Sequence, residues 1–271
     1  MSGGPADDVA VRPADERDGP QAPVIVLAYA QSGAARLQRL LRDTGLLACT
    51  TSTGVLPAGD QAAAAWRRID DRERLSPLAL ASVRSLVSGM MAAILAQAGR
   101  SRWCETAFVD PDCAETFLRA YPGARFVCLH RSCPEVIRAA ISAHPWGLAD
   151  TPFARHARAY PASASAAIAA YWAFVTESLL RFETAHPQAC LRVRYEDLGG
   201  RPGTAGQILD FLGLAPDRAA GVPVVPRREE EAAPAHVPAS QIPPPLLREV
   251  DELMSRLGYP PAWDEQAAGA V

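Results

Sequence analysis

Residues 31 to 36, with the sequence QSGAAR, form a short turn between an apolar run and a helical stretch. Gly33 permits a tight turn and a close approach of the backbone, and Ser32 offers a hydroxyl. Backbone N–H groups at the start of a helix can hold one phosphate or sulfate. The N–H groups in question are those of Gly33, Ala34, Ala35 and Arg36. Taken alone, the same residues are also typical of a plain strand-to-helix turn that uses small side chains for packing.

The turn lacks the GxxxxGK[ST] spacing of a nucleotide-hydrolysing loop, which argues against ordinary ATP or GTP hydrolysis. The 271 residues contain no lysine, so every side-chain cation is an arginine or a protonated histidine. The net charge of -3 excludes the strong basic excess of a protein that coats nucleic acid. We therefore expect no nucleic-acid partner, and any anion must be bound locally.

From residue 23 onward, short apolar runs alternate with helical stretches, which predicts an α/β fold with a mainly parallel sheet. The expected strands are residues 24–30, 103–109, 124–130 and 189–198. The expected helices are residues 33–43, 60–69, 77–98, 113–121, 133–143, 163–185, 203–213 and 244–257. Ser76 followed by Pro77 is typical of a helix N-cap and first turn.

The composition along the chain predicts a disordered tail over residues 1–22 and a single domain over residues 23–271. Within that domain, the proline-rich residues 215–245 are expected to be irregular. No apolar run approaches the roughly 20 residues needed to span a bilayer, so we expect a cytoplasmic protein without a membrane partner. The six cysteines are scattered without CxxC pairs, which predicts no metal site and no disulfide framework.

Three segments, taken in order, give the chain a recognisable pattern. They are PVIVLAYAQSGAARLQRLL, GARFVCLHRSCPEVIRAAI and CLRVRYEDLGGRPGTAGQILDFLGL. In order and spacing they resemble the sulfotransferase family that uses 3′-phosphoadenosine-5′-phosphosulfate, over about residues 23 to 214. Residues 242–259 resemble the terminal helix of its bacterial members. The resemblance implies a P-loop-like central parallel β-sheet flanked by helices, and this nucleotide as the cofactor.

The resemblance also implies roles for particular residues. The turn at 31–36 corresponds to the loop that binds the 5′-phosphosulfate. There Gln31 replaces the family's usual cation, while Ala34 and Ala35 replace two hydroxyl residues. Arg131 matches the arginine that grips the 3′-phosphate, since a planar guanidinium offers two parallel hydrogen bonds.

Two further positions bear on the nucleotide. The serine that the family carries eight positions after its arginine is here Ala139. Tyr195 matches a residue near the nucleotide that can pack against an adenine ring, while the acids that follow it, Glu196 and Asp197, are expected to hold the turn. The hydroxyls of CTTSTG, residues 49–54, can either return toward the phosphate loop or form an exposed turn.

Two residues are candidates for proton transfer. Glu105 lies where bacterial members carry a strand that leads to the acceptor pocket, and a carboxylate there can deprotonate an acceptor hydroxyl if burial raises its pKa. A buried carboxylate paired with an arginine is an equal alternative for Glu105. His130 precedes Arg131, and imidazole suits proton transfer at neutral pH. Neighbouring strand residues point to opposite faces, however, which argues against both His130 and Arg131 facing one site.

These observations lead to two functional hypotheses. The first is a bacterial sulfotransferase of secondary metabolism that acts on a hydroxyl or amine of a small-molecule acceptor. The second is a protein of the same fold that has lost the nucleotide site, and that binds a partner or transfers a different group.

Overall fold

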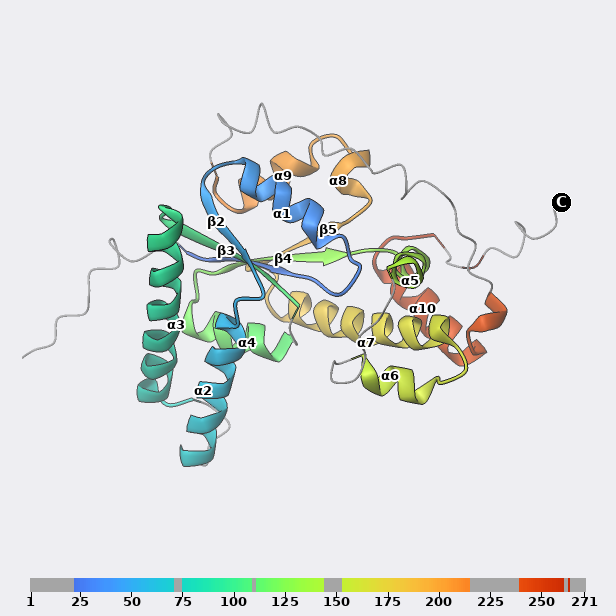
Figure 1. Cartoon of the computed structure of the whole chain (residues 1–271), viewed down its shortest axis with the longest axis horizontal. Coiled ribbons are helices and arrows are strands. Elements are labelled where there is room, and N and C mark those ends of the chain that lie inside the picture. Colours follow the sequence, from blue (N-terminus) through green and yellow to red (C-terminus); the bar gives the residue numbers. More distant parts are fainter. Residues whose placement is uncertain are drawn as a thin grey trace, which may run out of the picture.

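The structure, a computed structural model, describes residues 22–70, 75–108, 111–143, 153–214, 239–260 and 263. At its centre is a five-stranded sheet in the order β2-β3-β1-β4-β5 (Figure 1). Every neighbouring pair of strands is parallel. The strands are β1 (Val24–Leu27), β2 (Leu47–Thr51), β3 (Arg102–Ala107), β4 (Arg125–His130) and β5 (Cys190–Arg194). The predicted α/β fold with a parallel sheet is confirmed.

Helices cover both faces of the sheet, as expected for parallel strands joined by crossover connections (Figure 1). One face packs against α1 (Ala34–Asp43), α8 (Asp197–Gly200) and α9 (Thr204–Phe211). The other packs against a larger group of helices. These are α2 (Val55–Asp70), α3 (Pro77–Ala98), α4 (Pro111–Ala120), α5 (Cys133–Ser142), α7 (Ala164–Ala185) and α10 (Pro244–Arg256). Helix α6 (Ala154–Ala159) packs on α7.

The central strand is buried on both sides because each of its residues packs into one of two cores. All four residues of β1 are buried. Ile25 and Leu27 join the larger core, whereas Val24 and Val26 join the core beneath α1. The strand order places the carboxyl end of β1 in the middle of the sheet edge, with β3 on one side and β4 on the other.

The expected long helix at 77–98 is confirmed, and its N-cap is as predicted. Ser76 accepts a hydrogen bond from the N–H of Ala79 at 3.2 Å, and Pro77 occupies the first turn. Strand β2 and helix α6 were not among the expected elements. The segment LACTT of β2 ends in two threonines, so its sequence pattern is also typical of a turn. Pairing with β3 makes it a strand.

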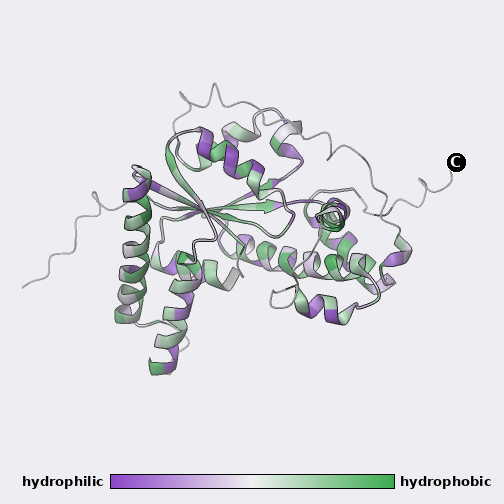
Figure 2. Ribbon diagram, in the orientation of Figure 1, coloured by the Kyte–Doolittle hydropathy of each residue, from purple (hydrophilic) through white to green (hydrophobic). Residues whose placement is uncertain are grey.

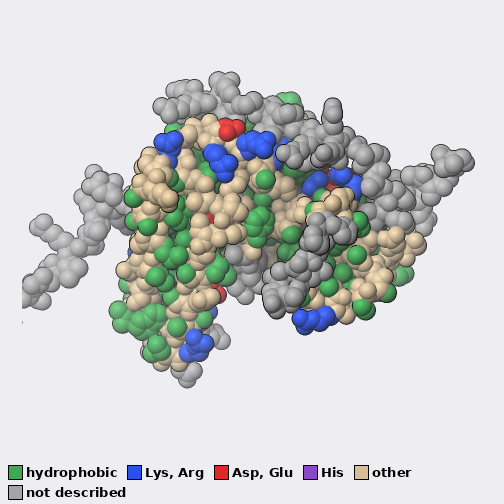
Figure 3. All heavy atoms as spheres, viewed as in Figure 1, with side chains coloured by type: hydrophobic (Ala, Val, Ile, Leu, Met, Phe, Trp, Pro, Cys, Tyr) green, Lys and Arg blue, Asp and Glu red, His purple; other side chains and the backbone are tan. Residues whose placement is uncertain are grey.

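Helix α3 corrects the expectation about apolar runs. Among the described residues, Pro77–Ala98 is long and apolar enough to cross a membrane by length and composition. It contains a single charge, Arg84, among small and apolar residues (Figure 2). Only 22% of its most apolar window is buried, and Figure 3 shows hydrophobic side chains gathered over α2 and α3.

Two expected segments lie largely outside the described residues. Residues 1–21 of the predicted tail and residues 215–238 of the predicted irregular segment belong to them. The rest of that segment contains a short 3-10 helix, η3 (Ala239–Gln241), followed by α10. The predicted closing helix at 244–257 is confirmed.

Candidate functional site

The turn at residues 28–33 leaves the carboxyl end of β1 and leads directly into α1. The N–H of Ser32 donates to the carbonyl of Tyr29 at 3.1 Å, which closes the turn. Gly33 is the N-cap of α1, with φ 84°, and no side chain caps the helix. An uncapped helix start leaves backbone N–H donors for another partner, together with the positive end of the helix dipole. The N–H of Arg36 is an exception, because it donates to the carbonyl of Gly33.

Tyr195 lies directly against this turn. A Cβ atom added to Gly33 would stand 2.2 Å from both Cδ2 and Cε2 of the Tyr195 ring. The ring is only 1% exposed. No other residue type fits at position 33 without moving the ring, so glycine is required here by close approach as well as by its positive φ.

Arg131 approaches the turn from the neighbouring strand. It follows β4 directly, and its Nη1 donates to the carbonyl of Gln31 at 2.9 Å. Its guanidinium stands 4.4 Å from the centre of the Tyr195 ring, and that of Arg36 stands 5.4 Å from the same ring. The structure therefore brings together Gln31, Gly33, Arg36, Arg131 and Tyr195, all of which were predicted site residues.

The charge of Arg131 is only partly balanced by its neighbours. Its side chain is 4% exposed, and its Nη2 stands 3.3 Å from a carboxylate oxygen of Glu135. Arg138 binds the same oxygen at 2.5 Å. A buried guanidinium that shares one carboxylate with a closer arginine has charge left to bind an anion.

Two buried polar atoms of the site have no hydrogen-bond partner among the described residues. They are the hydroxyl oxygen of Ser32 and the Nε of Arg131. Buried polar groups in proteins are nearly always paired, so unpaired ones at a turn of this shape point to a ligand. Hydroxyl, guanidinium and backbone N–H groups together form a donor set that suits phosphate or sulfate. Ala34 and Ala35, in the first turn of α1, add no side-chain donor.

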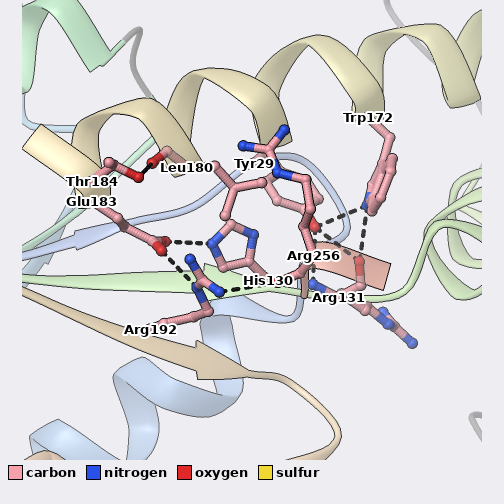
Figure 4. A network of polar contacts seen from close by, with 9 residues as sticks. All are labelled: Tyr29, His130, Arg131, Trp172, Leu180, Glu183, Thr184, Arg192 and Arg256. Carbon is pink, nitrogen blue, oxygen red and sulfur yellow. Dashed lines mark hydrogen bonds and ion pairs between the residues drawn. The ribbon is translucent and has the colours of Figure 1, made fainter. Parts of the chain in front are cut away.

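A tyrosine that the sequence analysis missed fixes the backbone of Arg131. The Tyr29 hydroxyl donates to the carbonyl of Arg131 at 3.0 Å and accepts from its N–H at 2.9 Å (Figure 4). Trp172 on α7 donates its indole N–H to the same carbonyl at 2.9 Å. Burial raises the pKa of Tyr29, so its hydroxyl stays neutral and keeps its proton for this bond. The local signal in the sequence was its place near the end of the expected strand 24–30.

His130 points away from the turn. Its Nε2 lies 2.6 Å from one carboxylate oxygen of Glu183 on α7, and Arg192 donates to the other oxygen at 2.6 Å. In Figure 4 the imidazole of His130 and the guanidinium of Arg131 lie on opposite sides of β4, as strand alternation predicts. A proton-transfer role for His130 stays a prediction, and the contacts of its Nε2 are structural.

We expect the free energy of unfolding of the Glu183→Gln variant to change less with pH in the acidic range than that of the unmodified protein. Burial by itself raises the pKa of Glu183, but the hydrogen bonds and charges of His130 and Arg192 outweigh it and lower the pKa below its usual range. A lowered pKa stabilises the fold above about pH 4.3, the usual value, and this contribution is lost as the pH falls through the folded value. Glu183→Gln should cost about 1–3 kcal/mol at pH 7. Urea unfolding of both proteins should show that difference shrinking between about pH 5 and pH 3.

The matched control for this prediction is Glu177→Gln on the same helix. Glu177 pairs with Arg256, but both side chains are about two-fifths exposed. Exposed pairs contribute at most about 1 kcal/mol, so we expect a smaller effect. If Glu183→Gln lowered the free energy of unfolding by the same amount at every pH, this would contradict the assigned role of the buried carboxylate.

The carboxylate of Glu105, on β3, contacts threonines of β2 and of the segment that follows it. Its carboxylate accepts hydrogen bonds from the Thr50 hydroxyl at 2.5 Å, the Thr53 N–H at 2.7 Å and the Thr53 hydroxyl at 3.0 Å. Its partners among the described residues are thus threonines rather than an arginine. In this geometry the carboxylate holds the segment after β2. The role of Glu105 as a general base stays a prediction.

Three of the four hydroxyls of residues 49–54, those of Thr50, Thr51 and Thr53, have identified partners. Thr50 and Thr53 bind Glu105, and the hydroxyl of Thr51 accepts a hydrogen bond from Gln38 on α1.

The acids after Tyr195 hold turns, as expected. Asp197 binds the guanidinium of Arg194 through both oxygens. Glu196 accepts from the N–H of Ser132 and from the hydroxyl of Tyr259.

Comparison with known proteins gives a consistent picture. A profile of the sulfotransferase family matches residues 23–218, which include the turn, Arg131 and Tyr195. A search of curated proteins finds no significant match.

Two solved structures share the fold. The sulfotransferase domain of the Synechococcus PCC 7002 olefin synthase superposes with a TM-score of 0.54 at 19% identity, and the match covers 91% of this chain and 98% of that one. Sulfotransferase STF9 from Mycobacterium avium superposes with a TM-score of 0.51 at 12% identity, over 91% of this chain and 80% of that one. At these identities the superpositions establish the fold alone. On the family profile, this chain belongs to the sulfotransferase family.

Proposed function

We propose that the protein transfers a sulfuryl group from 3′-phosphoadenosine-5′-phosphosulfate to a hydroxyl or amine of a small-molecule acceptor. The observation that supports this best is the meeting of three features beside the Tyr195 ring. They are the uncapped start of α1, the unpaired Ser32 hydroxyl and the buried Arg131 guanidinium. Each of them favours an anion, and they come from the ends of two adjacent parallel strands, where ligands of open α/β sheets bind.

The residues present fit a nucleotide with two phosphate-bearing ends. The Ser32 hydroxyl and the N–H groups that start α1 suit the 5′ end, and Arg131 suits the 3′-phosphate. The Tyr195 ring is buried against Gly33 and Arg131, so it positions these two residues instead of stacking on adenine. When bound, this nucleotide supplies the sulfuryl group that moves to the acceptor oxygen or nitrogen, while adenosine 3′,5′-bisphosphate leaves and the acceptor proton is released.

The departures from the family pattern affect the expected rate. Gln31, Ala34 and Ala35 each stand where the family has a group that can stabilise developing charge. Loss of one such preorganised donor costs about 10²- to 10³-fold in rate. Backbone N–H groups and arginines therefore carry the electrostatic stabilisation, and we expect a slow transferase.

Binding of adenosine 3′,5′-bisphosphate to the full chain tests the proposal. Isothermal titration calorimetry should give a Kd in the range of about 1–100 µM, equivalent to about -8 to -5.5 kcal/mol. Ala35→Thr should strengthen binding, because it returns a hydroxyl to an exposed position in the first turn of α1. Ala92→Thr, at an exposed position of α3, is the matched control and should leave binding unchanged. Absence of binding at millimolar nucleotide would overturn the proposal and favour a protein of this fold that has lost the nucleotide.

A further inference from the structure

The chain that follows α10 lies against the residue that comes directly after Arg131. Helix α10 lies beside α5 (Figure 1), and Tyr259 follows it after a short turn. The hydroxyl of Tyr259 donates to one carboxylate oxygen of Glu196 at 2.6 Å. The other oxygen of Glu196 accepts from the N–H of Ser132 at 3.1 Å. Two hydrogen bonds therefore join the end of α10 to the backbone beside Arg131.

A second contact from α10 reaches the next residue along the chain. The N–H of Cys133 donates to the sulfur of Met254 on α10 at 3.4 Å, and both residues are buried. Arg194, at the end of β5, donates to the carbonyl of Gly258 at 2.8 Å and fixes the chain that follows α10. The two N–H groups that come after Arg131 are thus both held by contacts that depend on α10.

The peptide groups of Arg131 are held by other elements. The Tyr29 hydroxyl binds its N–H and its carbonyl, and the Trp172 indole binds the same carbonyl. The side chain of Arg131 is buried, so a shift of its backbone also moves its guanidinium. Hydrogen bonds weaken steeply when the donor is misaligned. The contacts after Arg131 therefore bear on how well its guanidinium meets an anion.

The bond between Tyr259 and Glu196 has a fixed direction. Burial and the charge of Glu196 raise the pKa of Tyr259 far above its usual range, so the hydroxyl stays neutral and donates. The N–H of Ser132 is also a donor, and Glu196 accepts from each group with a different oxygen. The carboxylate is therefore held in one orientation between the two donors.

We propose that Tyr259 and Glu196 are positioning residues, which hold the backbone after Arg131 and so aim its guanidinium at the 3′-phosphate of the nucleotide. The inference rests on the proposed function, because it names residues that set the affinity for that nucleotide. Neither residue has to touch the nucleotide. The chain after α10 is thus part of the machinery that binds the 3′-phosphate.

Tyr259→Phe tests the role of the hydroxyl, because it keeps the ring and removes the bond to Glu196. The affinity for adenosine 3′,5′-bisphosphate should fall by about 10-fold, the effect of one hydrogen bond to a charged group. The affinity for adenosine 5′-monophosphate, which lacks the 3′-phosphate, should be unchanged. Calorimetry measures both nucleotides. Equal losses for the two nucleotides, or no loss for either, would overturn the inference.

Tyr121→Phe is the matched control for the loss of a tyrosine hydroxyl. Tyr121 is also partly buried, and its hydroxyl is hydrogen-bonded to Ser88 on α3 at 2.6 Å. This contact has no link to Arg131. We expect Tyr121→Phe to leave the affinities for both nucleotides unchanged.

Two substitutions of Glu196 separate its position from its charge. A glutamine can accept from Ser132 through its carbonyl oxygen and donate to the Tyr259 oxygen through its amide. Glu196→Gln should therefore bind the bisphosphate at least as tightly as the unmodified chain. Glu196→Ala loses both bonds and should bind it about 10-fold more weakly. If Glu196→Ala bound the bisphosphate as tightly as Glu196→Gln, Glu196 would act through charge alone and the inference would be overturned.

Hydrogen exchange without nucleotide separates the failure of the two proposals. In Tyr259→Phe, the N–H groups of residues 131–133 should exchange about 10-fold faster than in the unmodified chain. If the unmodified chain bound no nucleotide, the proposed function would be overturned. Faster exchange would then still support the hold of α10 on Arg131, and unchanged exchange would overturn that as well. Nucleotide binding that none of the variants alters would overturn this inference alone.

Discussion

Gly33→Ala is expected to lower the free energy of unfolding by about 2–5 kcal/mol. Two effects add. A left-handed backbone costs a residue with a Cβ about 1–2 kcal/mol, and an extra methyl group in a packed region costs about 1–3 kcal/mol. Both apply at Gly33, which has φ 84° and the Tyr195 ring 2.2 Å from the added atom. Urea unfolding followed by circular dichroism measures the loss.

Gly45→Ala is the matched control because it isolates the backbone effect. Gly45 also has positive φ, 68°, but nothing lies within 4 Å of an added Cβ. Its substitution should cost only about 1–2 kcal/mol. The double variant Gly33→Ala with Tyr195→Leu should lose less stability than the sum of the two single variants, because the ring is the obstacle. Equal losses for Gly33→Ala and Gly45→Ala would show that the ring does not lie on the turn.

Arg131→Lys is expected to weaken the binding of adenosine 3′,5′-bisphosphate by about 100-fold. Lysine keeps the positive charge but loses the planar fork of donors and the stacking on Tyr195. It also loses the guanidinium bond to the carbonyl of Gln31, which aligns the turn. Calorimetry with the nucleotide measures the change, and thermal melting checks that the variant is folded.

Arg39→Lys is the control, because it makes the same replacement of arginine by lysine at an exposed position. Arg39 lies on an exposed position of α1, the helix that starts at the turn. Exposed charges there are screened by solvent, so affinity should change by less than about 3-fold. A similar small change for Arg131→Lys would mean that this arginine serves packing rather than the nucleotide.

The parts of the fold that depend on local pattern could be predicted from the sequence. The apolar run that ends at Leu27, the small-residue turn and the helix after it form one continuous signal. Ser76 and Pro77 mark the start of α3 in the same local way. Strand β2 gave a weaker signal, because half of it is polar and only pairing with β3 makes it a strand.

The parts that depend on distant partners could not be predicted. His130 and Glu183 are 53 positions apart, and nothing near either one indicates the bond between them. Tyr29 and Arg131 are 102 positions apart, although the strand order places them side by side. Two hydrogen bonds, from Ser163 and Ser165 to Gln241, join the start of α7 to a segment that was expected to be irregular.

The position of β1 in the centre of the sheet has a consequence for the order in which the protein is built. Its partners β3 and β4 follow much later in the chain, and Arg131 reaches Gln31 across 100 positions. Such contacts form only after long loops have closed, which is slow. A nascent chain that does not yet include Tyr195 contains every residue of the turn but lacks the ring that packs against Gly33. The turn therefore takes up its full packing only after synthesis has passed Tyr195, more than 150 residues after its own glycine.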